Sequence, residues 1–338
     1  MLLTLSKMTF LSTLMLGVII ATSSTSWFTA WMGLELNLLS FLPLITSKTN
    51  MYTSEAALKY FLVQALGSAI IVSTTPITMV AQNLTHTPDI MITSALLMKM
   101  GAAPFHFWFP SVMQGISWPL CIILMTIQKI APIMLLSHII INSYSSLIQI
   151  IIMTSSLLSG IIGGFSGLNQ TLMRTIMAYS SINHMGWMLA AIVISKPLWS
   201  YYFFIYALVS SSVIMIFYTN QIFHFNQISL IHPSMLTKMS FFMSLLSLGG
   251  LPPFLGFLPK MLIIKELSSL SQIIWLIFLL VSTLLVLFFY LRIMSTTLLL
   301  SSITMKTQLY KSSKTINLTI IFLNLTPMFT PNHTLLPF

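Results

Sequence analysis

Four charged side chains lie inside or beside long apolar segments, where an ionised group is energetically unfavourable. Glu35 is in WFTAWMGLELNLLSFLPLI, Lys99 and Lys129 are in two later segments, and Lys260 follows a fourth. A charge at the centre of a bilayer costs roughly 2.5–3.5 kcal/mol on insertion scales, so such groups often mark an ion or proton pathway. Burial lowers the pKa of a lysine and a nearby carboxylate raises it again, so a buried Glu–Lys set can exchange protons near neutral pH.

Two of these lysines adjoin copies of one pattern, Gly-x-x-Pro-Phe-x-x-x-x-Pro. Lys99 precedes the first copy and Lys260 follows the second. The glycine and first proline of the two copies are Gly101, Pro104, Gly250 and Pro253. Two Gly/Pro-interrupted apolar segments at corresponding places in a chain are typical of a transporter's ion site. The alternative is that glycine and proline are simply more frequent in membrane helices than in soluble ones.

Two histidines are candidates for proton relay between the lysines. His106 lies in the first copy of the pattern, and His184 lies in the polar stretch AYSSINHMGW of an apolar segment. Imidazole changes charge near neutral pH and can act with hydroxyls and water. The alternatives are helix-packing histidines and a structural Glu–Lys pair with lysines at helix ends. For Lys59 and Lys265 that second alternative is preferred.

The composition excludes a soluble protein. The chain of 338 residues is 57% hydrophobic and only 5% charged, with a mean hydropathy of +0.96, so polar residues are too few to cover a soluble surface. The net charge of +10 comes from scattered single residues, which does not indicate a nucleic-acid interface. The single cysteine, Cys121, excludes a disulfide framework or a self-contained iron–sulfur cluster. No metal-ligand spacing is present.

We predict an all-α polytopic membrane protein, because a spanning helix needs about 20 apolar residues. About eleven spans meet this rule: 2–21, 26–46, 57–81, 89–109, 118–140, 146–167, 171–195, 198–222, 239–258, 271–296 and 315–331. We expect the first to be a retained helix rather than a cleaved signal. With no long connection between spans, residues 1–338 are predicted to form a single transmembrane domain. The run GIIGGFSG at 160–167 predicts close helix packing.

The basic residues predict an orientation. On alternating sides, the side of the N-terminus holds nine of them: Lys7, Lys48, Lys59, Arg174, Lys238, Arg292, Lys306, Lys311 and Lys314. The other side holds three: Lys196, Lys260 and Lys265. The positive-inside rule therefore places the N-terminus on the cytoplasm-equivalent side. The two interruptions fall on the fourth and ninth spans, which cross in opposite directions. This predicts an inverted repeat with half-repeats at about 26–140 and 146–296 and a C-terminal helix at about 315–331.

Six segments carry a resemblance to a known family: WMGLELNLLSFLPLI, TSEAALKYF, LLMKMGAAPFHFWFP, IQKIAPIMLL, GGFSGLNQTLMRTIMAYSSINHMGWM and SLGGLPPFLGFLPK. They are similar to the chain 2 family of animal mitochondrial NADH–ubiquinone oxidoreductase. Members of this family are antiporter-like membrane subunits of respiratory complex I, related to multisubunit cation/proton antiporters. The resemblance runs from about residue 25 to 295.

The resemblance implies a role for each charged residue. In that family the glutamate of WMGLE and the lysine of the first broken helix, here Glu35 and Lys99, form the pair that gates proton movement. The lysine of QKIAP, here Lys129, lies at the middle of the hydrophilic axis. The lysine of GFLPK, here Lys260, lies near the exit half-channel.

The resemblance also implies the surroundings of the chain. His106 and His184 fall on polar positions of the axis. The location would be the mitochondrial inner membrane, multi-pass, with the N-terminus in the matrix. The partners would be other membrane and accessory subunits of complex I, including neighbouring antiporter-like subunits, and lipids. NADH, flavin, iron–sulfur clusters and ubiquinone would be bound by partner subunits, and we expect no cofactor on this chain.

The expected function is that of a proton-translocating subunit, coupling electron transfer on other subunits to proton pumping. A standalone cation/proton antiporter would use the same Glu–Lys–Lys axis but would work without NADH and without large partners. A non-pumping structural membrane subunit is the third interpretation. It predicts that replacing Lys129 with methionine leaves pumping intact.

Overall fold

The computed structural model describes residues 5–47, 50–80, 87–143, 146–230, 235–299 and 314–329. Lys48, Lys306 and Lys311, which contributed to the predicted orientation, lie outside these ranges. The chain divides into two compact units, Met1–Ser159 and Gly160–Phe338, and the division falls inside a helix rather than in a loop. The predicted single domain with half-repeats at 26–140 and 146–296 stays a prediction.

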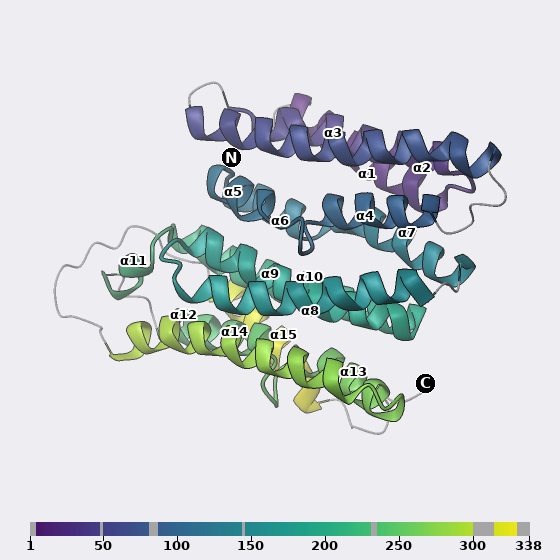
Figure 1. Cartoon of the computed structure of the whole chain (residues 1–338). Helices are drawn as coiled ribbons and strands as arrows, with labels where there is room; N and C mark the ends of the chain where they lie inside the picture. The colour runs from purple at the N-terminus through teal and green to yellow at the C-terminus, as the bar shows by residue number, and fades with distance from the viewer. Residues whose placement is uncertain are drawn as a thin grey trace. The chain divides into compact units, whose positions relative to one another are not determined.

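Helices make up the regular structure of the described residues (Figure 1). Those of the first unit are α1 (Leu5–Ser23), α2 (Trp27–Ile45), α3 (Met51–Val80), α4 (Thr87–Met100), α5 (Trp108–Gly115), α6 (Trp118–Met125) and α7 (Ile127–Ser143). Helix α8 (Ser146–Leu168) contains the division between the units. Those of the second unit are α9 (Met173–Ile194), α10 (Lys196–Asn220), α11 (Phe225–Leu230), α12 (Met235–Gly249), α13 (Phe257–Ser269), α14 (Ile273–Leu299) and α15 (Lys314–Phe329).

The all-α membrane architecture is confirmed. Eight helical segments of the described residues are long and apolar enough to cross a membrane, and two shorter apolar helices, Met235–Gly249 and Asn317–Pro327, accompany them. The prediction of about eleven spans is therefore approximate. Three spans also differ from the prediction because they are interrupted: 89–109 ends at Met100, 118–140 is divided at Thr126, and 239–258 ends at Gly249. Helix α13 was not predicted.

Close packing of small residues holds the first two helices together. A Cβ added to Gly33 of α2 would lie 2.5 Å from the backbone nitrogen of Ala21 in α1, and one added to Gly17 would lie 2.9 Å from that of Asn37. Because lipid competes for apolar side chains, helices in membranes associate through such close backbone approaches. This packing fixes α2, which carries Glu35, against α1.

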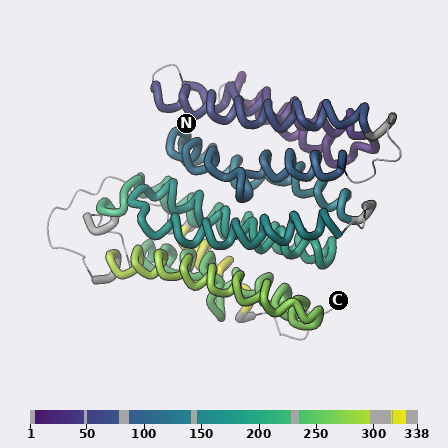
Figure 2. The backbone as a smooth tube through the Cα atoms, in the orientation of Figure 1, coloured from purple at the N-terminus to yellow at the C-terminus, as the bar shows by residue number. Residues whose placement is uncertain are grey.

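The glycine run of α8 packs in the same way, as predicted. A Cβ on Gly163 would meet the backbone of Asn183 in α9 at 2.7 Å, whereas Gly160, Gly164 and Gly167 face side chains of α14. The amide of Asn183 donates to the carbonyl of Gly160 over 3.0 Å. Helix α9 is buried over most of its length; its residues lie in the teal to green part of the trace in Figure 2.

Candidate functional site

The first interruption ends α4 with a glycine in the left-handed region. Gly101 has φ +72°. Its N–H donates to the carbonyl of Met98 over 3.2 Å, and the N–H of Ala102 donates to that of Leu97 over 3.1 Å. These two bonds form a Schellman motif, which satisfies carbonyls left free at a helix end and favours glycine because a Cβ is unfavourable at positive φ. The peptide that follows, Ala103–Pro104, is cis.

The second interruption repeats this geometry at the same spacing. Gly250 has φ +76°. Its N–H donates to Ser247 over 3.1 Å, and that of Leu251 donates to Leu246 over 3.3 Å. The Pro252–Pro253 peptide is cis, as at the first interruption. The two predicted helix breaks are confirmed, and the sequence pattern corresponds to one local structure that occurs once in each unit.

The two lysines adjoin the same end of their broken helices. Lys99 belongs to the last turn of α4. Lys260 follows its break in the chain, but its Nζ turns back and donates to the carbonyl of Gly249, the last residue of α12, over 2.9 Å. Each side chain is only 5% exposed. The C-terminal end of a helix carries partial negative charge, so a cation is stabilised there.

The side chain of Lys99 lies along helix α3. The side-chain amide of Gln64 donates to the carbonyl of Lys99 over 3.1 Å. A Cβ on Gly67, one turn further along α3, would be 3.0 Å from Cγ and 3.2 Å from Cε of Lys99. The absence of a side chain at Gly67 therefore makes room for the lysine.

Glu35 and Lys99 do not form a tight ion pair. In the part of the chain that the structure describes, no salt bridge within 4.0 Å joins them. Oε2 of Glu35 is buried and accepts no hydrogen bond from the described residues. A buried carboxylate oxygen is unfavourable without a hydrogen-bond partner.

A third interruption, which the sequence did not predict, lies just before Lys129. Helix α6 ends at Met125 and α7 begins at Ile127. The hydroxyl of Thr126 donates to the carbonyl of Ile122 over 2.6 Å, a back-bond of the kind that bends helices. Lys129 lies in the first turn of α7 and is 2% exposed, with Nζ 4.8 Å from the centroid of the Phe109 ring.

The two predicted histidines are held in different ways. His106 lies within the first interruption, where its Nδ1 is 3.2 Å from the carbonyl oxygen of Pro104. His184 lies on α9, where its Nδ1 is 2.8 Å from the hydroxyl of Tyr202 on α10. The Tyr206 ring lies 5.1 Å from the His184 ring.

The predicted residues fall into two sets, one in each unit. Glu35, Lys99, His106 and Lys129 belong to the first. In the second, α9 carries both His184 and Trp187, and the Nζ of Lys260 lies 5.9 Å from the Trp187 ring centroid. No three His, Cys, Asp or Glu side chains gather as metal ligands among the described residues.

Sequence reasoning missed several uncharged polar residues beside the lysines. They are Asn37, Tyr60, Gln64 and Gln128, all buried. Amides are rare in apolar spans because an unpaired polar group is unfavourable in the interior. Gln64 and Gln128 could have been singled out on that ground, since each lies within a predicted span.

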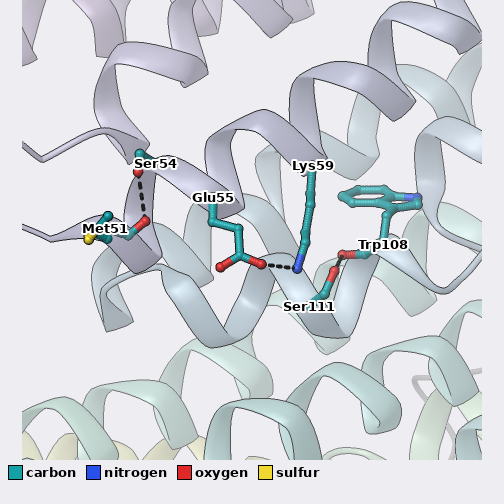
Figure 3. Close-up of polar contacts among 6 residues, drawn as sticks. All are labelled: Met51, Ser54, Glu55, Lys59, Trp108 and Ser111. Carbon is teal, nitrogen blue, oxygen red and sulfur yellow. Dashed lines mark hydrogen bonds and ion pairs between the residues drawn. The ribbon is translucent and has the colours of Figure 1, made fainter.

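Lys59 lies outside this arrangement. Figure 3 shows its ammonium paired with the carboxylate of Glu55, one turn earlier on α3, at 2.6 Å. The two side chains are 47% and 60% exposed, respectively. An exposed pair within one helix contributes about 0–1 kcal/mol. Lys59 is thus a matched reference for the buried lysines.

Comparison with known proteins places this fold in a family. The family model described as NADH:quinone oxidoreductase/Mrp antiporter, transmembrane region, matches residues 24–287. The chain belongs to this family. It is 48% identical to NADH-ubiquinone oxidoreductase chain 2 of Anopheles gambiae over 86% of this chain and 85% of that one. It is 46% identical to chain 2 of Aedes aegypti over 94% of this chain and 93% of that one.

One chain of a larger assembly of known structure has the same fold as this protein. A chain of respiratory complex I from Thermus thermophilus superposes with a TM-score of 0.81 at 23% identity, covering 95% of this chain and 76% of that one. Membership of the family thus rests on sequence, and the solved complex I chain shows the same fold.

Proposed function

We propose that this chain is a proton-translocating membrane subunit of the NADH:ubiquinone oxidoreductase, respiratory complex I. It would couple electron transfer on other subunits to proton pumping. One observation carries the proposal: Lys99, Lys129 and Lys260 are each at most 5% exposed, and each adjoins a helix interruption. A helix interruption exposes backbone groups, which is tolerated at membrane depth only where protein or water satisfies them.

The proton path uses the predicted residues in chain order. Glu35 and Lys99 form the first site, where the absence of a tight ion pair lets the charge of either group change. Lys129 is the middle site and Lys260 the exit site, with His106 and His184 relaying protons through water. Charges act over longer distances in a low-dielectric interior than in water, so protonation at one lysine influences the next.

The family names favour particular partners and a particular membrane. We place the chain in the mitochondrial inner membrane with its N-terminus in the matrix. Other membrane and accessory subunits of complex I, including neighbouring antiporter-like subunits, and lipids surround it. NADH, flavin, iron–sulfur clusters and ubiquinone bind to those partners, and the redox chemistry takes place there rather than on this chain.

The first test is a native gel of gently solubilised membranes, stained for NADH oxidation, with the chain located by mass spectrometry. A large NADH-active band containing the chain supports the proposal. A small band without NADH activity favours the standalone antiporter, which the shared family model also covers. Ion flux in liposomes would then be measured.

The second test separates pumping from structure. Lys129→Met removes the buried charge but keeps an unbranched side chain, so we expect fewer protons translocated per NADH in a complex that still assembles. Lys59→Met removes an exposed lysine and is the matched control, with an unchanged ratio. Normal pumping by an assembled Lys129→Met complex would exclude Lys129 from the path.

A further inference from the structure

A chain of buried hydrogen bonds joins three helices beside Lys129. The hydroxyl of Tyr60 on α3 donates to Oε1 of Gln128 on α7 over 3.1 Å. The Nε2 of Gln128 donates to Oδ1 of Asn37 on α2 over 2.9 Å. Tyr60, Gln128 and Asn37 are 2%, 9% and 3% exposed. The Gln128 amide uses its oxygen as acceptor and its nitrogen as donor, a combination that no carboxylate or hydrocarbon chain of the same length reproduces.

Packing against neighbouring residues fixes both ends of this series of hydrogen bonds. The Tyr60 ring lies 5.2 Å from the Phe41 ring and 5.9 Å from the Trp108 ring, each edge-on. The indole N–H of Trp108 donates to the carbonyl of Met98, in the turn that carries Lys99. Asn37 lies two residues after Glu35, on the helix that packs against Gly17. These hydrogen bonds and ring contacts therefore connect the helix of Glu35, the first interruption and the turn of Lys129.

The turn that carries Lys129 lacks one of the regular hydrogen bonds of a helix. The first N–H groups of a helix have no partner within that helix, and Lys129 bonds instead to the carbonyl of Thr126, over 3.1 Å. Pro132 lacks an N–H, so it cannot bond to the carbonyl of Gln128 four residues earlier. The Gln128 side chain adds two hydrogen bonds from this turn to neighbouring helices.

We propose that Gln128 is a positioning residue for proton translocation. Through its bonds to Asn37 and Tyr60 it holds the Lys129 side chain at a fixed position relative to Glu35. The inference rests on the proposed function, since it assumes that Lys129 carries protons. Gln128 itself neither gains nor loses a proton in this role. It fixes where the Lys129 ammonium lies when its charge changes.

The test compares substitutions in the whole complex in membrane vesicles. Gln128→Met keeps the length of the side chain and removes both bonds, and Tyr60→Phe removes one oxygen and one bond. The control is Gln149→Met, a glutamine on α8 outside this chain of bonds. For each variant, the amount of assembled complex, NADH oxidation with a water-soluble acceptor, and protons translocated per NADH are measured.

We expect the proton ratio to fall for Tyr60→Phe and to fall further for Gln128→Met, because these variants lose one and two interhelical hydrogen bonds, respectively. NADH oxidation with the soluble acceptor and the Gln149→Met control should be unchanged. A merely structural role would instead reduce the amount of assembled complex and leave the ratio per complex unchanged, which would overturn the proposal. If Gln128→Met does not assemble, the ratio for Tyr60→Phe decides.

Lys129→Met is measured in parallel to separate the two proposals. A lower ratio for Lys129→Met with a normal ratio for assembled Gln128→Met overturns the positioning role alone. A normal ratio for Lys129→Met overturns the proton path itself, and the positioning role with it.

Discussion

The ammonium of Lys260 bonds to the carbonyl of Gly249, 2.9 Å away across the second helix interruption. The lysine thereby occupies the space that a side chain at Gly250 would need. A Cβ there would lie 2.7 Å from Nζ and 2.8 Å from Cδ. Gly250 thus has two functions: it adopts the positive φ that ends α12, and it leaves room for the charged group.

Gly250→Ala should displace Lys260. The added methyl meets the lysine, and a residue other than glycine in the left-handed region costs roughly 1–2 kcal/mol. We expect a strongly reduced proton ratio and less assembled complex. Gly249→Ala is the matched control, because the nearest heavy atom to its Cβ would be 3.8 Å away. Equal effects at the two positions would contradict this account of the break.

Gly67→Ala should disturb Lys99 without breaking a helix. Its Cβ would lie 3.0 Å from Cγ of Lys99, so the flexible lysine chain must move by a few tenths of an ångström. Alanine also has the higher helix propensity, by about 1 kcal/mol. We therefore expect unchanged or slightly higher thermal stability of the complex together with a reduced proton ratio. Gly67→Val, with more bulk, should reduce the ratio further, and a ratio that does not depend on side-chain size would exclude this contact.

The interruptions that were predictable from the sequence are those with local causes. Gly101 and Gly250 end their helices through their own backbone freedom and through a bond to the residue three positions earlier, and the residue after each glycine bonds to a carbonyl five positions before itself. The interruption at Thr126 was missed because its chain neighbours are ordinary helix residues. A threonine hydroxyl bonded to the preceding turn is common in membrane helices and bends only some of them.

The contacts around the charges were not predictable, because they join distant parts of the chain. Asn37 and Gln128 are 91 residues apart, and Tyr60 and Gln128 are 68 apart. Apolar periodicity shows which face of a helix is buried but not which helix it meets. The sequence placed Lys99 and Lys260 beside matching interruptions, but it did not show that the Nζ of Lys260 folds back to the end of the helix before its glycine.

Asn324→Leu should loosen the C-terminal helix from the second interruption. The side-chain oxygen of Asn324 accepts a 2.8 Å hydrogen bond from the hydroxyl of Ser247, and its backbone carbonyl accepts one from the N–H of Leu255. Ser247 also bonds to Ser244, so its hydroxyl stays satisfied in the variant. The variant should lose about 0.6–1.7 kcal/mol of stability, the contribution of one interhelical hydrogen bond, and this should lower the melting temperature of the complex. Unchanged melting would show that the Asn324 side chain does not help to hold α15.

Gly33→Ala should be more damaging than Gly160→Ala, although both lie in helix contacts. At Gly33 the methyl would lie 2.5 Å from the backbone nitrogen of Ala21. A helix backbone, unlike a side chain, cannot relieve this contact by changing rotamer. Helix α1 must then move away from α2, at a cost of roughly 1–3 kcal/mol for overpacking. At Gly160 the nearest atom is the Oγ of Ser282, at 3.1 Å, and that side chain can rotate. Native gels and melting curves of the two variants measure this difference. A Gly33→Ala complex that assembles and melts like the unsubstituted one would show that close backbone contact between α1 and α2 is not what fixes the helix of Glu35.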